Sequence, residues 1–274
     1  YKLVYDDPND YKLELLVPKE KTYKVGDKLE SYDTNVGIGD VKLTVNGKTV
    51  HSCDMKIVPE EDEVCLKGER IEYRKNIYIM MNKPAGVVCS TKDGRSPTVI
   101  SLLPDNLKRK DIFPAGRLDK DTTGFVFLTN DGELAHRILS PAKHIAKYYF
   151  VKLAQPYCEK YEEAFAEGIV LENGEKCLPA RVSGIPNHAE CAVVELFEGK
   201  YHQVKRMFAA VENNVERLSR VQMGNLPIAA ELGFGECLEI LHNDVENLLK
   251  PSSFEDVQKK IITDFWSYLI NNNL

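Results

Sequence analysis

Residues 113–140 read FPAGRLDKDTTGFVFLTNDGELAHRILS and combine a polar loop, an apolar run and a helical pattern. The loop packs an arginine, two aspartates and two threonines between Gly116 and Gly124, a composition too polar for a core element. The run FVFLT that follows predicts a strand, NDG predicts a turn, and the remaining residues predict a short amphipathic helix that Pro141 ends. Taken alone, the loop fits a solvated turn, so its interpretation depends on the rest of the chain.

Strand-like and helical segments are mixed along the rest of the sequence without a strict alternation. Aromatic and β-branched runs predict strands, and apolar residues at helical spacing predict helices. We expect further strands at 77–82, 147–153, 189–197 and 215–223, and helices at 97–104, 158–169 and 201–212. This order favours an α+β fold, with a mixed, mostly antiparallel sheet flanked by helices, over a doubly wound fold.

The N-terminal part of the chain has a different pattern from the rest. Residues 1–35 are polar and weakly patterned, whereas residues 40–71 alternate as a small β unit. Its first two strands are expected at 40–45 and 49–58, with the turn NGK between them. We therefore predict three parts: an N-terminal module over residues 1–71, a main domain over residues 72–250 and a C-terminal amphipathic helix over residues 251–274.

The expected C-terminal helix opens with a capping-box pattern from Ser252 to Glu255. Apolar residues then recur at helical spacing, at Phe254, Val257, Ile261, Phe265 and Leu269. Such a stripe predicts a helix packed on the main domain.

Composition places the chain among ordinary soluble proteins. Its 274 residues are 43% hydrophobic and 28% charged, and no apolar run is long enough to span a bilayer. The start has no signal-peptide pattern, so we expect a cytoplasmic protein without a membrane partner. Seven cysteines without a CxxC pair and six scattered histidines predict reduced thiols and no metal site.

The net charge of −6 argues against non-specific binding to nucleic acid. The charge is unevenly distributed, however. Residues 71–150 carry 13 basic and 8 acidic side chains, whereas the flanking parts are net acidic. An anionic ligand docked on the middle of the chain would explain this pattern.

Three segments are more polar than packing requires. The first is the loop at 113–125. In the strand at 147–153, Lys147 and Tyr149 lie two apart and share one face. In the helix at 201–212, Lys205 and Arg206 come early in an otherwise apolar pattern. A cation near a carboxylate favours its ionised form, an aromatic ring stacks on a base, and a basic helix start favours phosphates.

These segments carry a resemblance to a known family. GRLDKDTTG at 116–124 resembles GRLDxxTxG, the catalytic motif of the pseudouridine synthases. Five further segments resemble the family's other motifs in the right order: MNKPAGVVCST (81–91), TNDGELAHRILSP (129–141), AKYYFVKL (146–153), GKYHQVKRMF (199–208) and RLSRVQMGNL (217–226). The resemblance covers roughly residues 77–245, and the wording HQVKRMF points to the RsuA-type branch, which modifies ribosomal RNA.

The resemblance implies an isomerase that converts a uridine in RNA to pseudouridine and needs no cofactor. Asp119 matches the catalytic aspartate, which either attacks the ribose or acts as a base on the sugar. Tyr149 matches the tyrosine that stacks on the target base and assists proton removal from carbon 5. Lys205 or Arg206 would supply the cation that keeps Asp119 ionised.

Further substrate contacts follow from the same resemblance. Arg117 is expected to contact RNA near the flipped nucleotide and to help fill the space that the base leaves. Lys83 is equally well explained as a turn charge or as a phosphate contact. The remaining expected contacts are Lys147, Leu218 and Arg220.

Several polar and aromatic residues are better explained by structural roles. We expect Asp121 to cap its own turn and Tyr148 to point to the opposite face of its strand from Tyr149. His202 invites a general-base role, but a polar histidine at the start of a helix is the preferred interpretation.

The N-terminal module resembles only part of its counterpart in RsuA-type enzymes, the S-four RNA-binding module. Residues 40–71 resemble the β half of that module, whereas the basic helix pair that should precede it is not visible in the sequence.

The predicted function is a pseudouridine synthase acting on ribosomal RNA or on a ribosomal subunit assembly intermediate. Small-subunit RNA is favoured over large-subunit RNA, and the enzyme is expected to be a monomer. One alternative is a non-catalytic RNA-binding or ribosome assembly factor on the same scaffold. Another is a sugar hydrolase that uses Asp119 and Asp121, which would require the two carboxyl groups to face one pocket about 5–9 Å apart.

Overall fold

The structure is a computed structural model that describes residues 2–7, 10–14, 43–50, 55–58, 61–70, 75–140 and 145–265. The chain forms two compact units, residues 1–75 and residues 76–274.

The first unit contains two small antiparallel sheets. One is the hairpin of β1 (Lys2–Asp7) and β2 (Asp10–Glu14), which the sequence pattern did not predict. The other has the strand order β4-β3-β5-β6, formed by β3 (Leu43–Val45), β4 (Lys48–Thr49), β5 (Val64–Leu66) and β6 (Glu69–Arg70).

The predicted hairpin around NGK is confirmed. Asn46 and Gly47 both have positive φ, at 52° and 74°, as a two-residue hairpin turn requires. The expected second strand at 49–58 is wrong in its extent, because residues 55–58 are not in a strand. Residues 51–54 lie outside the described residues.

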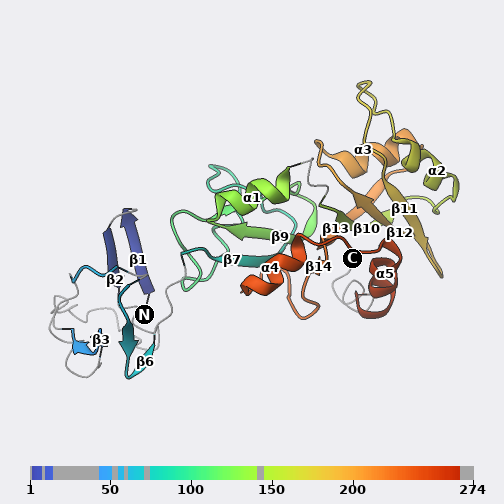
Figure 1. The fold of residues 1–274 in the computed structure, drawn as a ribbon. Helices are drawn as coiled ribbons and strands as arrows, with labels where there is room; N and C mark the ends of the chain where they lie inside the picture. Colours follow the sequence, from blue (N-terminus) through green and yellow to red (C-terminus); the bar gives the residue numbers. More distant parts are fainter. Residues whose placement is uncertain are drawn as a thin grey trace, which may run out of the picture. The chain divides into compact units, whose positions relative to one another are not determined.

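The second unit is built on a nine-stranded sheet whose main path is β11-β12-β10-β13-β9-β7-β15, with β8 paired to β9 and β14 paired to β13 (Figure 1). The strands are β7 (Tyr78–Lys83), β8 (Phe113–Pro114), β9 (Thr123–Thr129), β10 (Lys147–Leu153), β11 (Arg181–Ile185), β12 (His188–Leu196), β13 (Val215–Met223), β14 (Leu226–Pro227) and β15 (Cys237–Glu239). Apart from β9 and β13, which run parallel, the pairs are antiparallel. The predicted α+β fold with a mixed, mostly antiparallel sheet is confirmed.

Helices cover both faces of this sheet. α2 (Lys160–Glu167) and α3 (Gln203–Ala210) pack on one face, next to β10–β12 in Figure 1. α1 (Gly132–Leu139), α4 (His242–Leu248) and α5 (Phe254–Lys260) pack on the other. Successive strand residues alternate between the two cores, as in β10, where Tyr149 faces α3 and Tyr148 faces α5.

Two local predictions are corrected. The expected helix at 97–104 is a series of turns, in which Thr98 and Ser101 each accept a backbone N–H from the other through their hydroxyls. The cap of the last helix is Ser253, whose side chain accepts from the Asp256 amide, and Ser252 instead donates to the Gly224 carbonyl.

α5 is shorter than the predicted C-terminal helix. It ends at Lys260 and passes into a π-helical turn at Ile261–Phe265. Phe254, Val257 and Ile261 are buried as the apolar stripe predicted. Leu269 lies outside the described residues.

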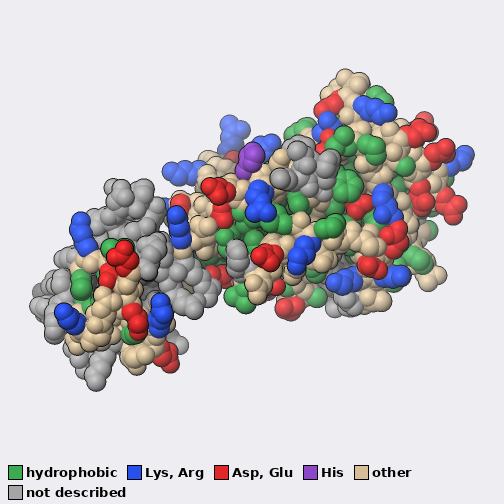
Figure 2. All heavy atoms as spheres, in the orientation of Figure 1, with side chains coloured by type: hydrophobic (Ala, Val, Ile, Leu, Met, Phe, Trp, Pro, Cys, Tyr) green, Lys and Arg blue, Asp and Glu red, His purple; other side chains and the backbone are tan. Residues whose placement is uncertain are grey.

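The surface is polar and mixed in charge. Figure 2 shows basic and acidic side chains interspersed on the visible face, with acidic ones gathered over α2. In the described part of the chain, no helix combines the length and apolarity that a bilayer span demands.

Candidate active site

The polar loop lies between β8 and β9, and Lys83 binds its backbone. This lysine ends β7 and is fully buried. Its ammonium group donates to three backbone carbonyls, of Pro84 (2.9 Å), Lys120 (3.2 Å) and Thr122 (2.7 Å). Two of these belong to the loop, so one buried side chain fixes the path of the backbone on the C-terminal side of Asp119.

The charge of Lys83 is maintained at an energetic cost. Burial lowers the pKa of Lys83 to about 8, partly offset by Cys89, Asp121 and Asp119. Because the three donors are already used within the protein, Lys83 positions the loop and offers no free donor to a phosphate. The phosphate contact considered from the sequence does not fit this arrangement.

The loop enters the sheet beside the strand that carries Arg220. Thr123 pairs with Ser219 and Gly124 with Arg220 in the parallel ladder of β9 and β13. Gly124 has φ +97°, and a Cβ atom here would lie 2.3 Å from the Arg220 carbonyl oxygen, so only glycine fits. On its other side β13 pairs with β10, and Arg220 is the partner of Tyr149. Three segments distant in sequence therefore meet in adjacent strands.

Asp119 is partly exposed, with 26% of its side chain accessible, and its carboxylate is available for chemistry. The basic group that meets it is His202, whose Nε2 atom lies 3.6 Å from Oδ1. His202 precedes α3 and has a left-handed backbone conformation, with φ +48°. Asp119 thus faces the start of a helix, where the helix dipole also favours a negative charge.

The ion pair predicted for Asp119 is not the one observed. Lys205 instead binds Asp121, with its Nζ atom 2.6 Å from both carboxylate oxygens. This hydrogen bond lowers the pKa of Asp121. Arg206 donates to the Asn173 side chain (2.7 Å) and to the Tyr201 carbonyl (3.3 Å).

The pairing of Asp121 has two consequences for the sequence interpretation. Asp121 joins the loop to α3 rather than only capping its own turn. Because Lys205 occupies both of its oxygens, Asp121 is also a poor candidate for the second carboxylate of a sugar hydrolase.

Tyr149 and Lys147 share one face of β10, as the alternation predicted. Tyr149 is 7% exposed and Lys147 is 8% exposed. The Lys147 ammonium donates to the Ile145 carbonyl at 3.0 Å. Burial, and secondarily Arg220, lowers the pKa of Lys147 to about 8. Tyr148 faces the other core and donates to the Ser252 carbonyl, which confirms its predicted orientation.

One donor group of the Arg220 side chain has no hydrogen-bond partner. Its side chain is almost completely buried, and Nε donates to the Phe125 carbonyl at 2.8 Å. One terminal nitrogen, Nη2, is buried without a hydrogen-bond partner, as is the hydroxyl of Thr122 in the loop. Unpaired buried donors are costly and uncommon in native structures.

The remaining predicted contacts flank this centre. Leu218 is buried in the core next to Tyr149, and its carbonyl accepts from the Thr123 hydroxyl at 3.3 Å. Arg117 is exposed at the start of the loop. The structure therefore gathers the loop, α3 and the faces of β10 and β13 at one place.

The sequence analysis named His202 only as a polar residue at the start of a helix, and it did not consider Tyr201. The rings of Tyr201 and His202 are stacked, with centroids 3.8 Å apart. The available signal was an aromatic residue and a histidine directly before a basic helix start.

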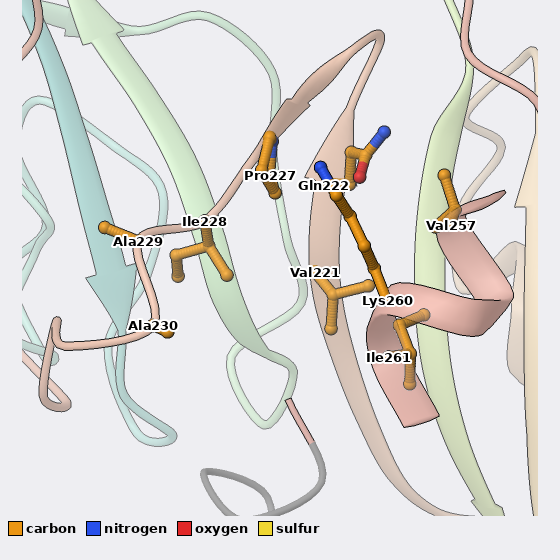
Figure 3. Close-up of a pocket in the computed structure, with 9 residues that line it drawn as sticks. All are labelled: Val221, Gln222, Pro227, Ile228, Ala229, Ala230, Val257, Lys260 and Ile261. Carbon is orange, nitrogen blue, oxygen red and sulfur yellow. The ribbon is translucent and has the colours of Figure 1, made fainter. Parts of the chain in front are cut away.

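A separate pocket of about 230 Å³ lies on the opposite side of β13 from Arg220. Figure 3 shows Val221, Ile228 and Ile261 around it, together with the α5 residues Val257 and Lys260. None of the predicted site residues lines this pocket. Among the described residues, no three histidine, cysteine or acidic side chains gather in a way that could hold a metal ion.

Comparison with known proteins places this geometry in a family. The model of the RNA pseudouridylate synthase family matches residues 77–210. Ribosomal small subunit pseudouridine synthase A of Haemophilus influenzae is 41% identical over 211 residues, which is 76% of this chain and 89% of that protein. The chain belongs to the RsuA-type pseudouridine synthases.

Other relatives of this RsuA-type synthase agree. An uncharacterized RNA pseudouridine synthase of Bacillus subtilis is 42% identical, covering 77% of this chain and 89% of its own. A crystal structure of a pseudouridylate synthase superposes with a TM-score of 0.59 at 39% identity, covering 76% of this chain and 88% of that one. The protein is therefore an enzyme that isomerises uridine to pseudouridine.

Proposed function

We propose that this synthase modifies a uridine of small-subunit ribosomal RNA, with Asp119 as the reacting carboxylate and Tyr149 beside the target base. The relatives named as ribosomal small subunit pseudouridine synthases support the choice of RNA. The observation that carries the catalytic assignment is the strand register, which brings the Asp119 loop, Arg220 and Tyr149 into adjacent strands. Ribosomal RNA as substrate implies a cytoplasmic enzyme.

The chemistry requires one bond to break and another to form. The bond from ribose carbon 1′ to uracil nitrogen 1 breaks, the base turns, and carbon 5 bonds to carbon 1′. Carbon 5 then loses its proton and nitrogen 1 gains one, so the product is an isomer of the substrate. Asp119 is partly exposed and lies near His202 at the start of α3, which supports a role in attacking the ribose or in acting as a base on the sugar. Both routes use the same ionised carboxylate.

The buried cations of β10 and β13 fit the substrate side of this proposal. A uridine beside Tyr149 would bring carbonyl or phosphate oxygens toward Arg220 and Lys147, where Nη2 of Arg220 has no partner within the protein. Such oxygens would satisfy a buried donor that otherwise remains unpaired. The exposure of Arg117 at the start of the loop supports a contact with RNA around the extruded nucleotide.

The test uses small-subunit RNA carrying tritium at carbon 5 of its uridines, because pseudouridine formation releases that label to water. Wild-type enzyme should release tritium, and Asp119→Asn should not. Large-subunit RNA should release far less, which tests the choice of RNA. The matched control is Asp121→Asn, which removes a carboxylate charge two residues away and should retain measurable turnover.

The other outcomes separate the alternatives. Tight RNA binding without tritium release would favour a non-catalytic RNA-binding or assembly factor. Free uracil in the reaction would indicate a hydrolase. Equal release from wild type and Asp119→Asn would remove Asp119 from the catalytic role.

A further inference from the structure

Packing within the protein does not explain the position of the aromatic side chain of Tyr201. It lies directly before the helix start that faces Asp119, and 75% of it is accessible to solvent. Among the large hydrophobic side chains that the structure describes, it is the most exposed. Burying an aromatic ring is strongly favourable, so a largely exposed tyrosine beside the candidate active site indicates a surface that meets a partner.

One face of the Tyr201 ring is already occupied by His202. The two rings lie nearly parallel, at 18°, with their centroids 3.8 Å apart. This stack leaves the other face of Tyr201 to solvent. An aromatic ring with one face packed and the other face open to solvent is the arrangement on which unpaired RNA bases stack.

The turn that carries the two rings is held in place by its neighbours. The Tyr201 carbonyl accepts from Arg206, and the Lys200 amide donates to the Gln203 side chain at 2.8 Å. Gln203 in turn donates to Glu198 at 2.8 Å. The left-handed backbone of His202 is costly and is retained only because these contacts fix it. A prearranged ring loses little entropy when a base stacks on it.

The stack also lies at the right place relative to the catalytic carboxylate. His202, the inner ring, is 3.6 Å from Asp119 through its Nε2 atom. Tyr201 is therefore separated from Asp119 by one stacked ring, and Lys205 and Arg206 follow on the same helix.

We infer that the outer face of Tyr201 stacks on an unpaired base adjacent to the target uridine, and that the Tyr201–His202 pair is a substrate-binding platform of this enzyme. The inference rests on the proposed RNA modification and extends it, because it adds a contact outside the reacting nucleotide. Stacking tolerates any base, so the platform selects an unpaired neighbour rather than a particular sequence.

The experiment compares Tyr201→Ala with Tyr201→Phe in the tritium-release assay on small-subunit RNA. Truncating a stacking ring costs about 1–3 kcal/mol per base, which corresponds to a 5- to 150-fold rise in KM for Tyr201→Ala. The kcat value should change little, and Tyr201→Phe should behave as wild type because the ring is retained. Leu241→Ala, a control at a 61% exposed residue outside the site, should leave KM unchanged.

Two outcomes would overturn the inference. A KM for Tyr201→Ala equal to that of wild type would remove the platform. A fall in kcat with unchanged KM would show that Tyr201 acts only through His202 and Asp119. Tyr201 is exposed, so the variant should fold, and an unchanged thermal unfolding midpoint checks this.

A second measurement keeps the platform separate from catalysis. The Kd for small-subunit RNA is measured for wild type and Tyr201→Ala, each in an Asp119→Asn background. Weaker binding of the double variant supports the platform even if wild type releases no tritium, in which case only the proposed function fails. Equal Kd values would overturn the platform whatever the activity.

Discussion

Replacing Lys83 with methionine should destabilise the protein and displace the catalytic loop. The change removes an ammonium group that binds three buried carbonyls. A buried acceptor left unpaired costs about 1–3 kcal/mol, so three cost roughly 3–9 kcal/mol. The variant also removes the cost of burying the Lys83 charge. Burial lowers the pKa of Lys83 from 10.5 to about 8, and at about 1.4 kcal/mol per pKa unit this cost is roughly 3 kcal/mol.

The net expectation for Lys83→Met is a loss of about 3 kcal/mol in the free energy of unfolding at pH 7, the midpoint of these opposing terms. Urea unfolding measures it as a lower transition midpoint with an unchanged slope. Tritium release should fall more than tenfold, because the loop that positions Asp119 loses its anchor. Lys120→Met is the matched control, since Lys120 is exposed and donates to Ser96, and its effect should stay within about 0.5 kcal/mol.

The same substitution has a pH signature. The folded protein releases the Lys83 proton near pH 8, whereas the unfolded chain holds it to about pH 10.5. Between these values the unfolded state binds more protons, so the free energy of unfolding rises with pH. The stability advantage of wild type over Lys83→Met should therefore grow by roughly 2 kcal/mol from pH 7 to pH 9.5. A variant that unfolds with wild type at both pH values and keeps its activity would refute the anchoring role.

Three further predictions test the site and its supports. Lys205→Met should cost less than about 1 kcal/mol of stability because its pair with Asp121 is partly exposed, yet it should lower tritium release at least tenfold. Combining it with Asp121→Asn should lower the release little further, and additive losses would count against a shared role of the two residues. Gly124→Ala should destabilise by more than about 3 kcal/mol in urea unfolding, against about 1 kcal/mol for Gly174→Ala, where φ is also positive but the space is open. Tyr148→Phe should lose about 1 kcal/mol with its bond to Ser252 and keep full turnover, and a loss of activity would mean that Tyr148 acts in the site.

The long elements of the fold were predictable because their signals are dense. β10 has four consecutive aromatic or β-branched residues at its centre, 148–151, and it begins and ends where predicted. α2 ends at Glu167 as the glycine after it predicted. The apolar run at 97–104 misled, because Thr98 and Ser101 satisfy each other's backbone groups and replace a helical turn.

The sequence names candidate members of the site but does not predict how they pair. The motif identifies Asp119 and Tyr149 as candidates without any coordinates. The cation nearest to Asp119 depends on where α3 begins relative to the loop, and this tertiary arrangement is not encoded in any local sequence pattern. Lys83 binds the carbonyls on either side of Asp121, and Lys205 binds the Asp121 side chain. His202 has a left-handed backbone conformation that a sequence does not reveal.

The parallel pairing of β9 with β13 joins residues that are almost a hundred positions apart in the chain. During synthesis, the GRLD loop emerges long before its neighbouring strand exists. An incomplete chain carries Asp119 before Arg220 is in place on the neighbouring strand. Because contacts of such long range form late, the competence to modify RNA belongs to the finished polypeptide.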